Sequence, residues 1–312
     1  MNIMTDVILP AGHSAMNLVL FILIPVMVVM ITLMRLLELT GFLDWVIDKL
    51  APLLHPFGLT GLGIFAALQI NLVSFAAPVA TLAVMEKRGT SERHLAATLA
   101  MVCAMAQANA SLPLTAMGLR LGPVLVISVI GGLVAAATTY YLFGRELSAK
   151  ESISDDRPHH GPAQGTKGVL DTIIRAGTEA FNLSISAIPF LILSLVVVNL
   201  LRQVGAIDAL TVLLAPVLQL LGIDPALVLL TITKYLAGGT ATLGVIDEMM
   251  RQQHLSVAVL NQSAGFLIHP FDLPGFAILI SAGRRVASVW KPAFGGACVG
   301  IAVRALLHII VC

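Results

Sequence analysis

Residues 58–85 read GLTGLGIFAALQINLVSFAAPVATLAVM and contain no charged side chain. A straight helix of this length would measure about 42 Å at 1.5 Å per residue, which is more than the ~30 Å of hydrocarbon in a bilayer. Gln69, Asn71 and Ser74 place polar groups in the middle of the stretch, and Pro78 follows them. Because proline interrupts the hydrogen-bond ladder of a helix, the pattern predicts a membrane segment that is broken near its centre.

Four more runs without charge lie outside this stretch, at residues 15–34, 95–119, 121–143 and 180–201. Each is long enough to cross the hydrocarbon as a helix, which satisfies its own backbone hydrogen bonds there. Charged residues make up 11% of the chain, less than half of the roughly 25% that is usual in soluble domains. We therefore expect an all-α, polytopic helical membrane protein in the lipid bilayer of the cell inner membrane.

The remaining composition argues against several other classes of protein. The net charge of +1 gives no reason to expect a nucleic-acid partner. Cys103, Cys298 and Cys312 lie in apolar surroundings without the spacing of metal ligands, so we expect no metal site and no cofactor. Residues 1–14 have no basic start, and we expect the first apolar run to stay in the protein as a helix.

A single long polar stretch, residues 145–175, separates two apolar regions. It has no apolar period and contains several Pro and Gly residues, which predicts a cytoplasmic linker with a mobile middle. The chain is thereby divided into a first membrane repeat, residues 1–144, and a second membrane repeat, residues 176–312. We call these the first half and the second half.

The two halves share a pattern of Pro, Gly and Asp residues at an offset of 164. The matching positions are Ile24-Pro25 with Ile188-Pro189, Gly41 with Gly205, Asp44 with Asp208, Ala51-Pro52 with Ala215-Pro216, Gly58 with Gly222, and Gly131-Gly132 with Gly295-Gly296. Internal duplication is common in secondary transporters, where the substrate site lies at the repeat interface.

Each half has about five hydrophobic segments, and one of them (residues 44–57 and 208–221) is short for a membrane span. If the short segments cross, each half crosses five times and the halves are inverted. If they do not cross, each half crosses four times and the halves are parallel. With the linker in the cytoplasm, the five-crossing arrangement alone also places Arg284 and Arg285 inside, as the positive-inside rule prefers. We therefore expect inverted repeats with broken or re-entrant helices.

Lys234 lies near the middle of the apolar segment 225–246. An ammonium group at that depth costs a few kcal/mol, so it normally faces a cavity or a partner. At the repeat offset, Thr233-Lys234 corresponds to the pair that begins with Gln69, and Asn71 follows that pair. The two halves therefore place polar side chains at the same depth of the same segment.

Helix breakers follow both of these polar groups. Gly238 and Gly239 follow Lys234, and Pro78 follows Asn71. Such residues free backbone groups and helix ends to contact a solute. The alternative is that the glycines only allow helices to pack closely.

A second pair of polar clusters lies in the next segment of each half, with Gln107 and Asn109 in the first half and His269 and Asp272 in the second. Asp272 is a candidate to pair with Lys234, to bind a coupling cation or to carry a proton. It is equally a candidate to cap the N-terminus of a half-helix, and one residue can do both. The candidate solute or coupling-ion contacts are Gln69, Asn71, Gln107, Asn109, Thr233, Lys234, Asn261, Gln262, His269 and Asp272, and the candidate helix breaks are Pro78, Gly238, Gly239, Pro270 and Pro274.

The duplicated unit resembles the nucleoside recognition, or Gate, domain of spore maturation membrane proteins A and B and of concentrative nucleoside transporters. The resemblance rests on the Ile24-Pro25 helix, the short segment that contains Gly41 and Asp44, the Ala51-Pro52 pair, and the polar helix that follows. It implies a membrane protein with a transport role and no enzymatic activity. The sequence contains none of the common catalytic motifs.

Our leading hypothesis is a secondary transporter of a small polar solute with a site at the repeat interface. Lys234 suggests an anionic, organic-acid-like solute, whereas the resemblance implies a nucleoside-like one. The coupling ion would be H⁺ or Na⁺, and a homo-oligomer is a further candidate partner. The alternative is a non-transporting scaffold or a subunit of a larger membrane complex, and a channel is a third hypothesis.

Overall fold

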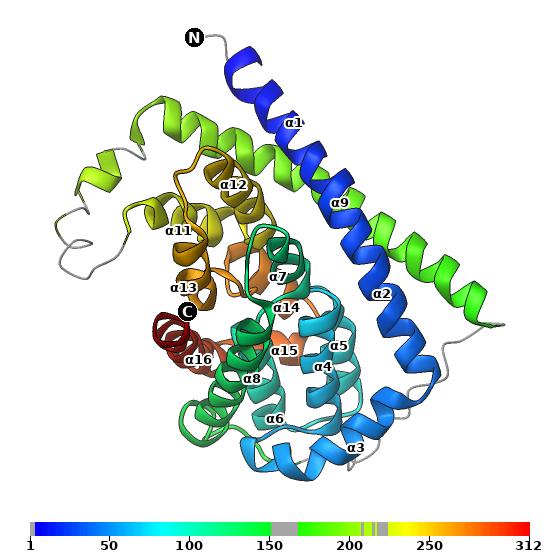
Figure 1. The fold of residues 1–312 in the computed structure, drawn as a ribbon. Helices are drawn as coiled ribbons and strands as arrows, with labels where there is room; N and C mark the ends of the chain where they lie inside the picture. The colour runs from blue at the N-terminus through cyan, green and yellow to red at the C-terminus, as the bar shows by residue number, and fades with distance from the viewer. Residues whose placement is uncertain (1–3, 151–167, 207–208, 214–215, 217–223) are drawn as a thin grey trace.

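The computed structural model describes residues 4–150, 168–206, 209–213, 216 and 224–312, and every element in these ranges is helical (Figure 1). The first half contains α1 (Leu9–Leu18), α2 (Ile24–Leu39), α3 (Phe42–Leu54), α4 (Gly61–Leu72), α5 (Ala77–Lys87), α6 (Glu92–Ala104), α7 (Ala108–Thr115) and α8 (Leu121–Thr138). The second half contains α9 (Val169–Gln203), α11 (Ala226–Ala237), α12 (Gly239–Arg251), α13 (Val257–Leu267), α14 (Leu273–Ile280), α15 (Arg284–Ser288) and α16 (Trp290–Val311). The expected mobile middle of the linker and most of the short segment 208–221 lie outside the described residues.

In the described part of the chain, four helical stretches are long and apolar enough to cross a membrane. They are Leu9–Leu39, Glu92–Thr115, Leu121–Phe143 and Trp290–Val311. The second of these, formed by α6 and α7, is 94% buried inside the protein, whereas the other three are between 28% and 39% buried. The multi-pass membrane protein that the composition predicts is thus confirmed, with α6 and α7 at its centre and the other three spans apolar on the outside.

The charge-free stretch 58–85 folds into a hairpin of two short helices, α4 and α5, which pack against each other. Thr60 caps α4, because its hydroxyl oxygen accepts a hydrogen bond from the Gly63 amide at 3.4 Å. Pro78 lies in the first turn of α5, where a missing amide hydrogen is tolerated. At about 18 Å each, α4 and α5 are both too short to cross the hydrocarbon alone. The predicted break near the centre of the stretch is present.

Before this hairpin, α3 and the 3₁₀ turn that follows it make an angle of 104° with α4. The turn depends on Gly58, which has a φ of +79°, and a Cβ there would come within 2.4 Å of the Tyr140 ring. The first half therefore has three candidate spans by length, or a fourth if the bent pair counts as one. With the bent pair this count equals the four crossings weighed from the sequence, and without it the count is one lower, because residues 58–85 form a hairpin.

The helices of the second half follow those of the first in the same order. The bounds of α4, α5, α6 and α7 recur in α11, α12, α13 and α14 within two residues of the 164-residue offset. The agreement ends after α14, because α15 is inserted before α16. Contacts also alternate between the halves, since α5 packs on α14 and α12 packs on α7. The two sets of helices are interleaved and do not form separate lobes.

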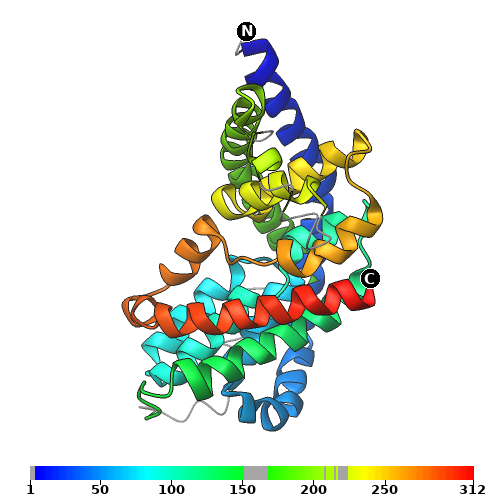
Figure 2. The same cartoon turned by 90° about the vertical axis from the view of Figure 1, so that its left-hand side faces the viewer.

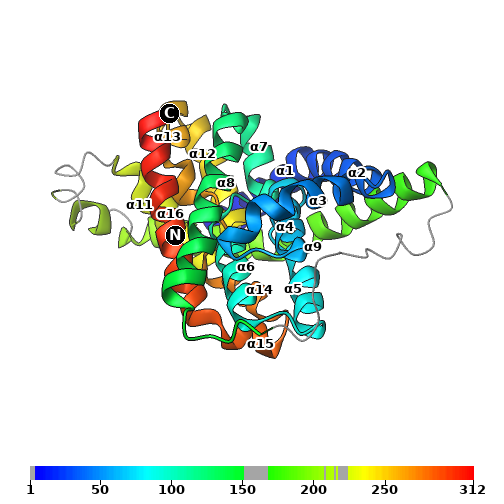
Figure 3. The same cartoon turned by 90° about the horizontal axis from the view of Figure 1, so that it is seen from below.

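Two groups of long helices flank the hairpins. Helices α1 and α2 cross α9 on one side of the molecule, and α8 and α16 lie on the other (Figures 1 and 3). Figure 2 shows α8 and α16 running side by side. Glycines permit this contact, because a Cβ on Gly300 would lie 2.5 Å from the carbonyl oxygen of Gly131.

Candidate functional site

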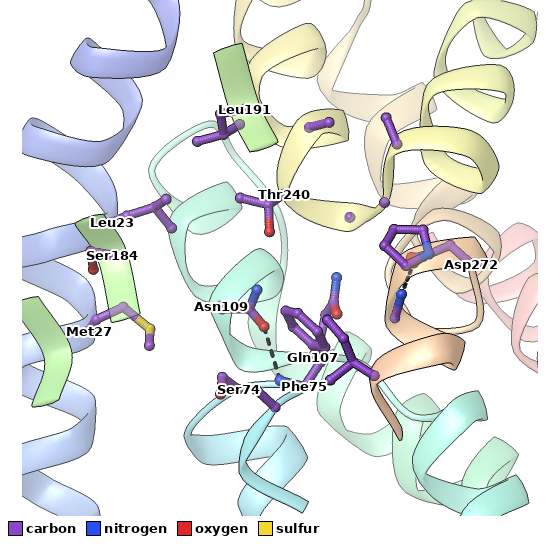
Figure 4. A pocket seen from close by; sticks show the side chains of 18 residues that line it. Leu23, Met27, Ser74, Phe75, Gln107, Asn109, Ser184, Leu191, Thr240 and Asp272 are labelled. Carbon is purple, nitrogen blue, oxygen red and sulfur yellow. Dashed lines mark hydrogen bonds between the residues drawn. The ribbon is translucent and has the colours of Figure 1, made fainter. Parts of the chain in front are cut away.

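Four helix breaks converge on one cavity of about 230 Å³ (Figure 4). The breaks lie between α4 and α5, between α6 and α7, between α11 and α12, and between α13 and α14. The polar residues that line the cavity are Ser74, Gln107, Asn109, Ser184, Thr240 and Asp272. Each half thus contributes two breaks to the cavity.

The opposite wall of the cavity comes from the crossed helices and is mostly apolar. Leu23 and Met27 lie on the α1–α2 stretch, and Ser184 and Leu191 lie on α9. Figure 4 shows these side chains on the far side of the space from Gln107 and Asn109. Polar groups are thus concentrated on the broken helices, where free backbone groups are also available.

The break between α11 and α12 is a single glycine. Gly238 has a φ of +89°, which favours glycine, and a Cβ there would lie 2.9 Å from the Pro274 ring. A Cβ on the next residue, Gly239, would lie 1.9 Å from Nε2 of Gln107. These two glycines therefore allow the α11–α12 tip to approach Pro274 at the α13–α14 break and Gln107 at the α6–α7 break.

Asp272 lies at the break between α13 and α14 and does two things there. Its Oδ1 accepts a hydrogen bond from the Gly275 amide at 2.8 Å, which caps α14. Its Oδ2 pairs with Nζ of Lys234, which also donates to the carbonyl oxygen of His269 at 2.6 Å. Both side chains are buried. Of the roles that the sequence left open, pairing and capping are combined in this residue.

Neutral side chains stabilise the corresponding break between α6 and α7. The Ser128 hydroxyl accepts a hydrogen bond from the Ala106 amide at 2.7 Å and donates to Oδ1 of Asn71 at 2.9 Å. Oδ1 of Asn109 accepts a hydrogen bond from the Phe75 amide at 3.3 Å, which ties α7 to the tip of the α4–α5 hairpin. One freed backbone amide at each of these breaks, that of Ala106 and that of Phe75, thus has a side-chain partner.

The structure brings some of the candidate residues together and separates others. Those that line the cavity are Gln107, Asn109, Asp272, Gly238, Gly239 and Pro274. Four other candidates lie behind the cavity wall. Asn71 and Lys234 make hydrogen bonds to residues at or beside the breaks, and His269 and Pro270 belong to the break between α13 and α14. Pro78 lies in the first turn of α5, outside the cavity lining.

Four candidates lie away from the cavity because their helices turn them elsewhere. Gln69 lines a different cavity and accepts a hydrogen bond from the Thr81 hydroxyl at 2.7 Å. Thr233 bonds to the backbone of its own helix at Leu229. Asn261 binds the segment before α8, where its Oδ1 accepts from the Arg120 amide at 2.8 Å. Gln262 is exposed.

Several residues of the lining were not among the candidate contacts chosen from the sequence. Ser74 and Phe75 form the tip of the first hairpin, and Thr240 follows the glycine break of the second. The signal for the tip was present, since both residues lie between Asn71 and Pro78. The wall residues of α2 and α9 carry no signal, because apolar residues are normal throughout a membrane helix.

A second cavity of about 790 Å³ lies on the other side of the α4–α5 hairpin. Its lining includes Arg35 and Glu179, which form an ion pair of 3.0 Å between α2 and α9. Ser74 and Ala76 belong to the lining of both cavities. Among the described residues, no group of three or more His, Cys, Asp or Glu side chains is placed to hold a metal ion.

Residues 20–124 match a family described as Gate, nucleoside recognition. This match confirms the resemblance inferred from the Pro, Gly and Asp pattern over that part of the chain. No curated protein matches the chain in sequence.

Solved structures of CNTnw, a concentrative nucleoside transporter, resemble the chain over nearly its whole length. CNTnw in an inward-facing substrate-bound state has a TM-score of 0.68 at 15% identity, and the match covers 99% of this chain and 84% of that chain. A doubly substituted CNTnw in an outward-facing state has a TM-score of 0.67 at 16% identity, with 99% and 85% covered. A singly substituted CNTnw in an intermediate state has a TM-score of 0.65 at 16% identity, with 92% and 75% covered. At this level of identity the likeness establishes a shared fold.

Proposed function

We propose that this protein is a secondary transporter that carries a small, neutral, nucleoside-like solute across the cell inner membrane by alternating access. The observation that carries the proposal is the convergence of four helix breaks on one cavity. Broken helices at the repeat interface are where secondary transporters hold their solutes. The shared fold with transporter structures in outward-facing and inward-facing states supports the same function.

The lining of the cavity suits a neutral solute with polar edges and an apolar face. The amides of Gln107 and Asn109 offer both donors and acceptors, and Phe75 and the wall from α2 and α9 offer apolar contact. The charge of Lys234 is balanced by Asp272, and Lys234 does not line the cavity. The reason given by the sequence for an anionic solute therefore has no support in the described residues.

The proposed topology has two inverted repeats, residues 1–144 and 176–312, joined by a cytoplasmic linker at 145–175. The first half has three candidate spans, Leu9–Leu39, Glu92–Thr115 and Leu121–Phe143, with the hairpin between the first two. The second half has α9, the α13–α14 pair and α16 in the same order around the α11–α12 hairpin. Each half then crosses the membrane three times. Because three is an odd number, the second half is inverted relative to the first, as it would also be with five crossings.

The proposed motion separates the four broken helices from the crossed helices α1, α2 and α9. A motion of one half against the other is disfavoured, because the contacts of α5 with α14 and of α12 with α7 bind the halves together. The cavity lies between the broken helices and the crossed helices. The apolar wall there makes few directional bonds, so it can slide with little loss. The second cavity offers a route to the site, because Ser74 and Ala76 line both.

Binding and uptake measurements test the proposal. The purified protein is screened against nucleosides by isothermal titration, and then reconstituted in liposomes for uptake under Na⁺ and H⁺ gradients. Asn109→Ala and Gln107→Ala are expected to weaken binding by roughly 10- to 100-fold, the loss of one or two buried hydrogen bonds. Gln262→Ala is the matched control, because Gln262 is exposed. Wild-type uptake by both cavity variants would remove this site, and the absence of any solute together with a fixed co-purifying partner would favour the scaffold alternative.

A further inference from the structure

Arg304 on α16 is a fully buried cation that the proposed solute site does not use. Its Nη1 donates to the carbonyl oxygen of Ala104, and its Nη2 donates to that of Ile268 at 2.9 Å. No carboxylate in the described ranges lies within ion-pair distance of it. The positive charge is therefore directed at backbone oxygen atoms.

Both of these carbonyl groups belong to ends of broken helices. Ala104 is the last residue of α6, and Ile268 is the C-cap of α13. The two residues are separated by the repeat offset of 164. The last carbonyl groups of a helix have no partner within it, and each helix end carries roughly half of an elementary negative charge. Two such ends amount to about one negative charge, which a single guanidinium group matches.

Two glycines let the neighbouring helices approach α16 at Arg304. A Cβ on Gly131 of α8 would lie 2.1 Å from Cγ of Arg304, so this glycine leaves room for the side-chain stem. A Cβ on Gly265 of α13 would lie 2.4 Å from the carbonyl oxygen of Arg304, so this glycine leaves room for the α16 backbone. The guanidinium group thereby reaches the ends of α6 and α13.

In transporters with discontinuous helices, freed carbonyl groups and the C-terminal ends of half-helices coordinate the coupling cation. We propose that Arg304 is a built-in cation that takes this role at the ends of α6 and α13. The place therefore binds no Na⁺, and the breaks that shape the solute cavity keep their geometry without one. Only one test of this inference, the measurement of solute affinity, rests on the proposed function.

Chemical rescue of Arg304→Ala tests the proposal. The melting temperature of the purified full-length variant in detergent is measured in dilute guanidinium chloride, NaCl and choline chloride at matched ionic strength. The variant is expected to melt below the wild type and to regain most of the loss, saturably, in guanidinium chloride. Wild type and Arg251→Ala are expected to show no such gain, because Arg251 is exposed and pairs with Asp247. Equal effects of guanidinium and choline on Arg304→Ala would overturn the proposal.

A second pair of variants separates charge from packing and covers the case in which Arg304→Ala does not fold. Arg304→Lys keeps a cation at the helix ends, whereas Arg304→Met keeps the stem without the charge. The lysine variant is expected to melt above the methionine variant, and the reverse order would overturn the proposal.

The solute measurement distinguishes this inference from the proposed function. Solute affinity of the wild type is expected to change by less than about twofold between NaCl and choline chloride. A saturable increase of solute affinity with Na⁺ concentration, if it is also seen in Arg304→Lys, would count against a built-in cation as well. If no solute binds at all, the proposed function fails, while the melting comparisons still decide the role of Arg304.

Discussion

At the break between α6 and α7, the Ser128 hydroxyl binds the freed Ala106 amide and is itself bonded to Asn71, whereas at the break between α13 and α14 the charged pair Lys234 and Asp272 binds the backbone. The helices on either side of the two breaks have nearly the same bounds at the repeat offset. Both breaks share the guanidinium group of Arg304, and beyond it one break uses neutral side chains and the other a charged pair. The difference lies in what happens when one partner is lost, because an unpaired buried charge costs far more than an unpaired amide.

The largest expected effect is at the charged break. Asp272→Ala leaves Lys234 buried without its carboxylate and removes the cap of α14. We expect the free energy of unfolding to fall by about 3–5 kcal/mol, the usual result of breaking a buried ion pair from one side. Unfolding in mixed micelles with increasing sodium dodecyl sulfate measures the change.

Asp272→Asn separates the charge from the cap, because asparagine caps a helix as well as aspartate does. Its loss is expected to be smaller than that of Asp272→Ala by about 1 kcal/mol, and adding Lys234→Met should recover most of the remainder. Wild-type stability of both single variants would mean that the two breaks do not differ in the way described.

The next largest effect is expected at the break between α11 and α12, where Gly239 of the second half lies against Gln107 of the first half. Gly239→Ala places a methyl group where Nε2 of Gln107 now lies, 1.9 Å away. The flexible Gln107 side chain would have to turn away, so the solute should lose the hydrogen bonds of its amide and binding should weaken roughly 10- to 100-fold in isothermal titration. Gly122→Ala is the matched control, because nothing lies within 4 Å of a Cβ at that position. Equal affinities for the two variants would show that the tip of α12 does not shape the site.

A smaller effect is expected at the neutral break. Asn71→Ala removes the acceptor of the Ser128 hydroxyl but leaves the Ala106 amide bonded to that hydroxyl. We expect a loss of about 1–2 kcal/mol in the same unfolding assay. Ser128→Ala in the Asn71→Ala background should then add less than it does in the wild type, because the two residues share one network. If the loss of unfolding free energy were as large as that of Asp272→Ala, the neutral and the charged break would not differ in the way described.

The smallest effect concerns the starts of the two central half-helices. Ser91 caps α6 by accepting from the His94 amide at 3.3 Å, and Ser256 caps α13 by accepting from the Val259 amide at 3.2 Å. Ser256→Ala should lower the free energy of unfolding by about 1 kcal/mol. Ser91→Ala should lower it somewhat more, because Ser91 is buried and its hydroxyl also bonds Nδ1 of His94 at 2.7 Å. A larger loss for Ser256→Ala would contradict this order.

Local signals in the sequence predicted the breaks well. Pro270, Pro274 and Gly238 act on the backbone at their own positions, so their effect can be predicted without the rest of the fold. The pairing of Lys234 with Asp272 was one of the roles weighed, because a charge in hydrocarbon needs a partner. A break within residues 58–85 was predicted from the polar residues and the proline in that run, but the sequence did not show that the two parts fold back on each other as a hairpin.

The directions of side chains were harder to predict. Gln69 was placed at the site because it shares a depth with Lys234, yet it faces the second cavity and bonds to Thr81. Depth in the membrane does not determine which face of a helix a residue occupies. The role of Arg304 depends on α16 lying between the ends of α6 and α13, and such a contact between distant segments has no local signature.

Because the chain is synthesised from its N-terminus, Lys234 and Arg304 differ in whether their partners already exist when they are made. Arg304 follows both of its acceptors, Ala104 and Ile268, so the two helix ends already exist when it is synthesised. Lys234 precedes Asp272 by 38 residues. At roughly 5–20 residues per second, its ammonium group waits ~2–8 s for the carboxylate. During biogenesis, α11 therefore has to remain at the membrane surface or in the insertion machinery until α14 has been made.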